Sequence, residues 1–178
     1  MDFEAFRDSF PDYARDVKIN LGTVLTTDGS PDLNEAQIAG IALSSAYSIG
    51  GKILIAAVES KFSNVLTPEI RNAAKAASAI MAMNNVYYRY VHLAHDEAIS
   101  KLPAKLRMNI MSNSGVPKID FELMSLAISA LNGCGACMEA HTKELSKHEL
   151  SKVAIQSSVK IAAVLNSAAK IAELSSLE

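Results

Sequence analysis

Residues 119–147 read IDFELMSLAISALNGCGACMEAHTKELSK, and this stretch decides the fold. Its apolar periodicity predicts two helices, over residues 119–131 and 134–147, joined by a tight corner at Asn132–Gly133. It holds both cysteines of the 178-residue chain, Cys134 and Cys137, with His141 four residues after the second. A helix beginning near Cys134 would place Cys137 and His141 on one face, and its N-terminus and the imidazole would both favour a thiolate. The stretch therefore predicts a redox-active hairpin over residues 119–147.

Glu122 is the candidate partner of His141. It lies nine residues before the corner, about 13 Å along the first helix at ~1.5 Å per residue, whereas His141 lies about 10 Å along the second. A carboxylate in so apolar a segment needs a specific partner. We expect Glu122 to orient the ring and His141 to accept the thiol proton. A purely structural ion pair at Glu122 is the alternative.

The two sulfur atoms are expected to have different surroundings. Cys134, at the corner, is predicted to be the more exposed and the easier for a large partner to reach. Cys137, deeper in the hairpin and nearer His141, suits a small substrate. A peroxide would oxidise one thiolate to a sulfenic acid, the other thiol would condense with it, and an external dithiol would reduce the disulfide.

Two other interpretations of these residues stay open. The cysteines could be incidental buried thiols. Alternatively, Cys134, Cys137 and His141 could bind zinc, with His148 as a candidate fourth ligand, although no second paired motif is present. Outside the hairpin, we expect His92, His95, Asp96 and Glu97 to cap and solvate the end of the helix over residues 86–93 rather than to bind a metal.

Helical periodicity continues through the rest of the chain, and no convincing alternating strand is present. The sequence therefore predicts an all-α fold without a significant β-sheet. Thr67 and Pro68 are a typical N-cap and first helical residue. The expected helices cover residues 3–21 with a break at Pro11, 33–48, 52–63, 68–83, 86–93 and 149–174, the last with Val153, Ile155, Val159, Ile161, Val164, Leu165 and Ile171 facing inward.

A faint repeat suggests a duplicated helical hairpin. Ala79, Ile80, Ala82 and Asn84 recur 48 residues later as Ala127, Ile128, Ala130 and Asn132. Asn84–Asn85 is accordingly expected to break the helix before it, as the Asn132 corner does. Only the second copy has the cysteines and the histidine.

Composition limits the possible functions. Hydrophobic residues make up 49% of the chain, charged residues 20%, and the net charge is −2, which indicates a globular protein and disfavours nucleic acid or an anionic membrane as the main partner. One domain over residues 1–178 is the simplest organisation. With no signal peptide or membrane-spanning segment visible, we expect a cytoplasmic protein, in which C-x-x-C indicates catalysis or metal binding.

Several motifs resemble the alkyl hydroperoxidase AhpD family, within the carboxymuconolactone decarboxylase-like superfamily. The similarity runs nearly end to end, through the segments FPDYARDVKINL at 10–21, MAMNNVYYR at 81–89, LRMNI at 106–110, GVPK at 115–118, FEL at 121–123 and the C-x-x-C with Ala140–His141. It implies an all-helical AhpD-like domain, usually a homotrimer. It also implies a thiol peroxidase that reduces alkyl hydroperoxides.

The resemblance also implies partners and residue roles. The reductant would be the dihydrolipoyl group of a dehydrogenase-complex acyltransferase, and the peroxiredoxin AhpC could be a further partner. Cys137 would form the sulfenic acid, Cys134 would resolve it and meet partner thiols, and Glu122 and His141 would form the proton relay. One departure is Ala136, where the family commonly has a histidine.

We therefore expect a lipoyl-dependent peroxidase with no bound metal, haem or flavin. The alternatives are a disulfide-exchange protein or redox switch without efficient turnover, and a lyase of the carboxymuconolactone decarboxylase kind.

Overall fold

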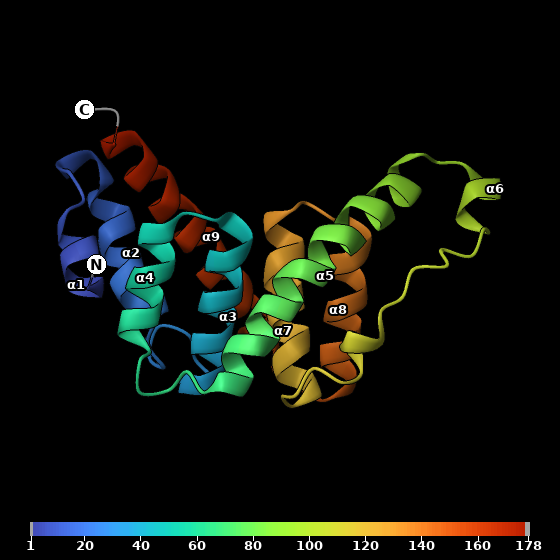
Figure 1. Ribbon diagram of the computed structural model, residues 1–178, viewed down its shortest axis with the longest axis horizontal. Coiled ribbons are helices and arrows are strands. Elements are labelled where there is room, and N and C mark those ends of the chain that lie inside the picture. Colours follow the sequence, from blue (N-terminus) through green and yellow to red (C-terminus); the bar gives the residue numbers. More distant parts are fainter. Residues whose placement is uncertain (1, 177–178) are drawn as a thin grey trace.

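The computed structural model describes residues 2–176 and shows only helices and loops within that range (Figure 1). This confirms the predicted all-α fold. The α-helices are α1 (Phe3–Asp8), α2 (Arg15–Val24), α3 (Glu35–Ile49), α4 (Lys52–Lys61), α5 (Pro68–Leu93), α6 (Glu97–Ser100), α7 (Lys118–Leu131), α8 (Gly135–Lys147) and α9 (Lys152–Ser175), with 3₁₀ turns at Asp12–Ala14 and Asn109–Met111.

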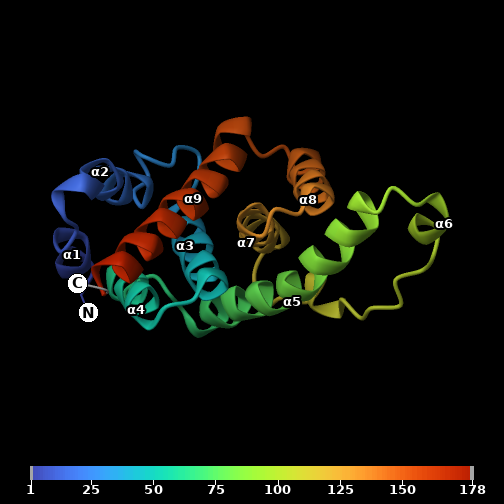
Figure 2. The same ribbon diagram turned by 90° about the horizontal axis from the view of Figure 1, so that it is seen from above.

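Helix α7 is the centre of the half of the molecule that contains the cysteines. Residues 121–129 are all buried, and α7 packs against α3, α5, α8 and α9 (Figure 2). A helix that is apolar on every side is stable in water only when neighbours surround it. This central position takes Glu122, which lies on α7, into the protein interior.

Helix α3 approaches α7 closely at Gly40. A Cβ atom added there would lie 2.4 Å from Met124 Cε, so the absence of a side chain gives the Met124 thioether its space. Residues 38–46 of α3 are buried as completely as the middle of α7. Close packing against α3 thus holds α7, the first helix of the predicted hairpin, in a fixed position.

Local capping signals place most helix starts. Thr67 Oγ1 accepts a hydrogen bond from the backbone N–H of Ile70, and Pro68 begins α5, as predicted. At α9 the start is later than expected, because Ser151 accepts a hydrogen bond from the Ala154 N–H and caps the helix there. Val153 then lies in the first turn and is exposed, contrary to its predicted inward orientation. Two further helix bounds differ from their predicted positions by two residues: α3 begins at 35 and not at 33, and α4 ends at 61 and not at 63.

Helix α5 corrects the predicted break at Asn84–Asn85, because it continues without interruption from Pro68 to Leu93. Both asparagines are buried, and the Asn85 side chain is hydrogen-bonded to residues of the α7 end of the hairpin. An asparagine whose side chain is held by a neighbouring element does not compete for the backbone of its own helix. The first copy of the faint repeat is therefore one continuous helix, and the duplicated hairpin was a wrong prediction.

The segment after α5 projects from the rest of the molecule and carries α6 (Figure 1). Asp96 caps the start of α6 by accepting hydrogen bonds from the N–H groups of Ala98 and Ile99, rather than capping the end of the helix before it, which was the prediction. At the base of this segment Val86, Tyr90 and Leu93 expose apolar side chains from α5. Within residues 2–176, no helix is both long and apolar enough to cross a membrane.

Candidate active site

The corner between α7 and α8 places both cysteines. Gly133 adopts a φ of 66°, a left-handed conformation that glycine adopts at little cost after a helix end. Cys134 then serves as the N-cap of α8, where its Sγ accepts a hydrogen bond of 3.3 Å from the Cys137 N–H. Cys137 lies in the first turn of α8, as the sequence predicted, and the helix dipole there favours negative charge on sulfur.

A disulfide joins Cys134 and Cys137, with their Cα atoms 5.3 Å apart. Cys134 is 0% exposed and Cys137 is 6% exposed, so the prediction that Cys134 would be the more accessible sulfur was wrong. The reason is the capping geometry, which turns the Cys134 side chain inward toward the helix it caps. In this oxidised state a large partner does not reach Cys134 without a movement of the corner.

Glu122 and His141 meet in the interior, as their predicted depths required. Glu122 Oε2 and His141 Nδ1 are 2.6 Å apart, and both side chains are buried. A carboxylate only accepts hydrogen bonds, so this contact assigns the proton to Nδ1 and leaves Nε2 as the basic nitrogen. The pair thus holds the imidazole in the tautomer that a general base requires.

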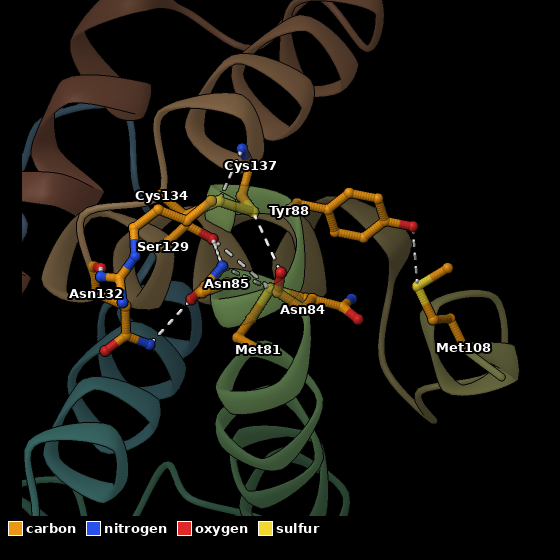
Figure 3. Close-up of a disulfide and its surroundings, with 10 residues drawn as sticks. Met81, Asn84, Asn85, Tyr88, Met108, Ser129, Asn132, Cys134 and Cys137 are labelled. Carbon is orange, nitrogen blue, oxygen red and sulfur yellow. Dashed lines mark hydrogen bonds between the residues drawn. A yellow bond between two sulfur atoms is a disulfide. The ribbon is translucent and has the colours of Figure 1, made fainter. Parts of the chain in front are cut away.

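Cys137 and His141 open into one small cavity of about 170 Å³. Cys134 is not part of its wall. Cys137 Sγ also lies 3.9 Å from the main-chain oxygen of Asn84 on α5, beside Tyr88 (Figure 3). A nucleophile and a base that face a common, mostly apolar space can act on one small substrate. The full lining is Met81, Asn84, Tyr88, Ala136, Cys137, Ala140 and His141.

A polar network, buried at Asn85 and Ser129 and exposed at Arg89, holds α5 against the hairpin beneath the disulfide (Figure 3). The Asn85 amide donates to Ser129 Oγ at 2.9 Å, and the Asn132 amide donates to Asn85 Oδ1 at 2.9 Å. Arg89 adds a hydrogen bond of 2.6 Å to the Asn132 main-chain oxygen. The sequence alone did not predict this network, although two adjacent asparagines in an apolar helix are a signal that a tertiary partner exists.

Charged groups at the open end of the hairpin connect α7 to α8. Hydrogen bonds from Lys118, and then from Lys147, lower the Glu144 pKa from 4.5 to about 2. On the same turn as Lys118, burial raises the pKa of Asp120, although the hydrogen bond from Gln37 opposes the shift. These contacts fix the far ends of the helices and stay outside the cavity.

The zinc alternative finds no support in this geometry. His148 Nε2 lies 3.5 Å from Glu144 Oε1 instead of approaching the cysteines. Among residues 2–176 no group of three or more histidine, cysteine, aspartate or glutamate side chains is placed to hold a metal ion.

Comparison with known proteins agrees with these features. The sequence model of the carboxymuconolactone decarboxylase family matches residues 97–176, which include the whole hairpin. Three relatives, each called "Alkyl hydroperoxide reductase AhpD", align over nearly their full length. The protein of Rhizorhabdus wittichii is 44% identical over 96% of this chain and 97% of its own. That of Coxiella burnetii is 48% identical over 94% and 95%. That of Beijerinckia indica is 45% identical over 99% and 97%. The chain belongs to the AhpD family.

Ala136, the position at which this AhpD-family chain departs from the expected histidine, lies in the cavity wall. It also lines a wider groove of about 460 Å³ that runs along the end of α5 toward α6. Tyr88 is also common to both walls, so the cavity and the groove adjoin at Tyr88 and Ala136. The side chain at position 136 therefore controls how much space lies beside Cys137.

Proposed function

We propose that this protein is a thiol-dependent alkyl hydroperoxide reductase whose redox centre is the pair Cys134 and Cys137. One observation carries the proposal: Cys137 and His141 face a common apolar cavity, and Glu122 holds the imidazole from behind at 2.6 Å. The names of the AhpD relatives support a peroxide-reducing oxidoreductase. The roles of individual residues are our proposal.

In the proposed reaction, His141 Nε2 accepts the Cys137 proton and the thiolate attacks the terminal oxygen of the hydroperoxide. The O–O bond breaks, Cys137 becomes a sulfenic acid, and the alkoxide takes the proton back from the imidazolium and leaves as an alcohol. The Cys134 thiol then gives up its proton and attacks the Cys137 sulfur, and the sulfenic hydroxyl takes up a proton and leaves as water when the disulfide forms.

An external dithiol must supply two electrons to reopen the disulfide. We propose the dihydrolipoyl group of a lipoylated dehydrogenase-complex acyltransferase as this reductant, AhpC as a possible further partner, and a cytoplasmic homotrimer as the working form. No bound cofactor is part of the proposal. The exposed apolar side chains of Val86, Tyr90 and Leu93 are consistent with a subunit interface.

The test is peroxide-dependent turnover with a lipoylated domain and its dehydrogenase, for the natural sequence beside Cys134→Ser, Cys137→Ser and Ala136→His. We expect turnover that both serine variants abolish. After one equivalent of hydroperoxide, a sulfenic acid should be trapped by dimedone in Cys134→Ser and absent in Cys137→Ser. Higher activity of Ala136→His would show that the missing histidine limits the relay.

A silent natural protein whose disulfide still forms and is reduced would contradict the peroxidase and leave a disulfide-exchange protein or redox switch. Activity on a lactone acid that survives loss of both cysteines would instead indicate the lyase.

A further inference from the structure

A wider groove adjoins the small cavity that contains Cys137. The cavity has a volume of about 170 Å³ and the groove a volume of about 460 Å³. Ala136 of α8 and Tyr88 of α5 line both spaces, and we call this pair of residues the junction. A molecule that occupies both spaces at once lies beside the junction. The rest of the groove is lined by Val91, His92, His95, Asp96, Glu97 and Ser100.

The two junction residues differ in how much space they fill. Tyr88 has a large ring, and its hydroxyl donates to Met108 Sδ at 3.9 Å, which ties the ring to the segment before α7 (Figure 3). Ala136 is half-buried in the first turn of α8 and contributes a single methyl group. The backbone of a helix sets the direction of each Cβ atom, so a longer side chain at 136 would extend from a fixed point. Position 136 therefore sets the width of the junction.

The cavity by itself holds only a small group. An apolar cavity of about 150 Å³ is large enough to bind benzene, and the cavity beside Cys137 is only slightly larger. It therefore accommodates about six carbon atoms. A hydroperoxide with a longer chain has carbons left over when its reactive end lies at Cys137 and His141, and the groove is the adjoining space that can take them.

The groove can accept an alkyl chain without separating buried charges. Val91 and Tyr88 give it apolar surface from α5. Both acids in its lining already have partners: Asp96 accepts hydrogen bonds from two backbone N–H groups of α6, and Glu97 pairs with Lys101 at 3.0 Å. A chain that covers the apolar surface leaves these contacts in place, so its burial is favourable.

The groove is also separate from the exposed apolar surface of α5. At about 3.6 residues per turn, positions 88, 91 and 92 fall on the opposite side of the helix from positions 86, 90 and 93. The latter carry the exposed side chains of Val86, Tyr90 and Leu93. A subunit that covers this apolar surface therefore does not cover the groove side of α5.

The continuous space leads to only one of the two sulfur atoms. Cys137 lines the cavity, whereas Cys134 is 0% exposed and lines neither the cavity nor the groove. In the proposed reaction Cys137 is the sulfur that attacks the hydroperoxide. The occupant that this continuity favours is therefore the hydroperoxide and not the reductant.

We propose that the groove is a second substrate subsite for alkyl hydroperoxides longer than about six carbons, and that Ala136 is the specificity-determining residue that keeps it open to the cavity. This inference rests on the proposed peroxidase function. The –OOH group lies beside Cys137 and His141, the nearest carbons fill the cavity, and the rest of the chain follows the apolar surface of the groove. The substrate class is a hydroperoxide with a medium or long apolar chain.

The test is a ratio of rates for two hydroperoxides that differ only in length. Oxidation of the reduced protein by octyl and by hexyl hydroperoxide is followed in single turnovers as the loss of free thiols. A methylene contributes about fourfold when fully buried and less when partly open to water, so the natural sequence should react about 4- to 15-fold faster with the octyl compound. In Ala136→Leu this preference should disappear, because the leucine fills the junction. Only the ratio is compared, since position 136 also lines the cavity and a change there affects both rates.

Ala140→Leu is the matched control. Ala140 lies one turn further along α8 and lines the cavity but not the groove, so the same added bulk should leave the ratio within twofold of its natural value. Ala136→Val takes the place of the leucine variant if that variant does not fold. Ala136→His should also lower the ratio, even where the added histidine raises both rates through the relay.

The inference is overturned if the natural protein shows no preference for octyl hydroperoxide, or if Ala136→Leu and Ala140→Leu have the same effect on the ratio. It is also overturned if Ala136→Leu keeps the ratio and instead slows reduction of the disulfide by dihydrolipoamide, because the groove then serves the reductant. Failure of the proposed function would look different. In that case neither hydroperoxide would oxidise the natural protein, and the inference about the groove would fall with it.

Discussion

Replacement of Glu122 by glutamine tests the proposed relay most directly. Glutamine has nearly the same shape, so the packing of α7 is preserved while the negative charge is lost. In the natural protein the carboxylate fixes the proton on His141 Nδ1 and compensates the positive charge that the ring gains when it accepts a proton. Glutamine can either accept from or donate to Nδ1, so both tautomers of the ring become available and the imidazolium loses its counter-ion.

The magnitude follows from the geometry of this contact. The two atoms are 2.6 Å apart, Glu122 is 6% exposed and His141 is 8% exposed. A hydrogen bond to a charged group contributes about 1.5–3 kcal/mol. At about 1.4 kcal/mol per tenfold change in rate, we expect Cys137 oxidation to slow by about 10- to 150-fold.

The assay is single-turnover oxidation of the reduced variant by cumene hydroperoxide, with urea unfolding measured in parallel. Glu139→Gln is the control, because Glu139 is an exposed acid on α8, the helix that carries His141, and its loss should leave the rate within twofold. If Glu122→Gln oxidises as fast as the natural protein while it remains folded, Glu122 is a structural ion-pair residue and the relay assignment is refuted.

Three further predictions concern stability and titration. The Cys134–Cys137 disulfide joins residues separated by 3 positions in the sequence. Its reduction should lower the free energy of unfolding by about 2 kcal/mol in calorimetry, and an unchanged Tm would contradict this. Asn85→Ala removes the hydrogen bonds to the buried Ser129 hydroxyl and to the half-buried Asn132 amide and should destabilise by about 1–3 kcal/mol in urea unfolding, whereas a neutral result would refute the network. Lys118→Met should raise the Glu144 pKa in NMR titration from about 2 toward 4.5; because that pKa is depressed on folding, its stabilising contribution is present above pH 4.5 and lost as the pH falls toward 2.

Local patterns in the sequence were sufficient to predict the fold class and, within the site, the contact between Glu122 and His141. The apolar periodicity of residues 119–147 and the Asn132–Gly133 corner predicted the α7–α8 hairpin to within one residue. From the hairpin alone, the depths of Glu122 and His141 along their helices predicted that the two side chains meet. Such predictions succeed because helix rise and corner geometry are properties of the local chain.

The remaining features needed the tertiary structure, because each depends on contacts between distant segments. The asparagines at 84 and 85 resemble a helix break until α7 provides Ser129 and Asn132 as partners for Asn85. Cys134 appears exposed at a corner until its capping role turns the sulfur inward. The cavity exists only where α5 crosses the first turn of α8. The sequence by itself therefore determined the helices and the residues that could react, whereas the packing of α5 against the hairpin decided which of the two sulfur atoms faces the cavity.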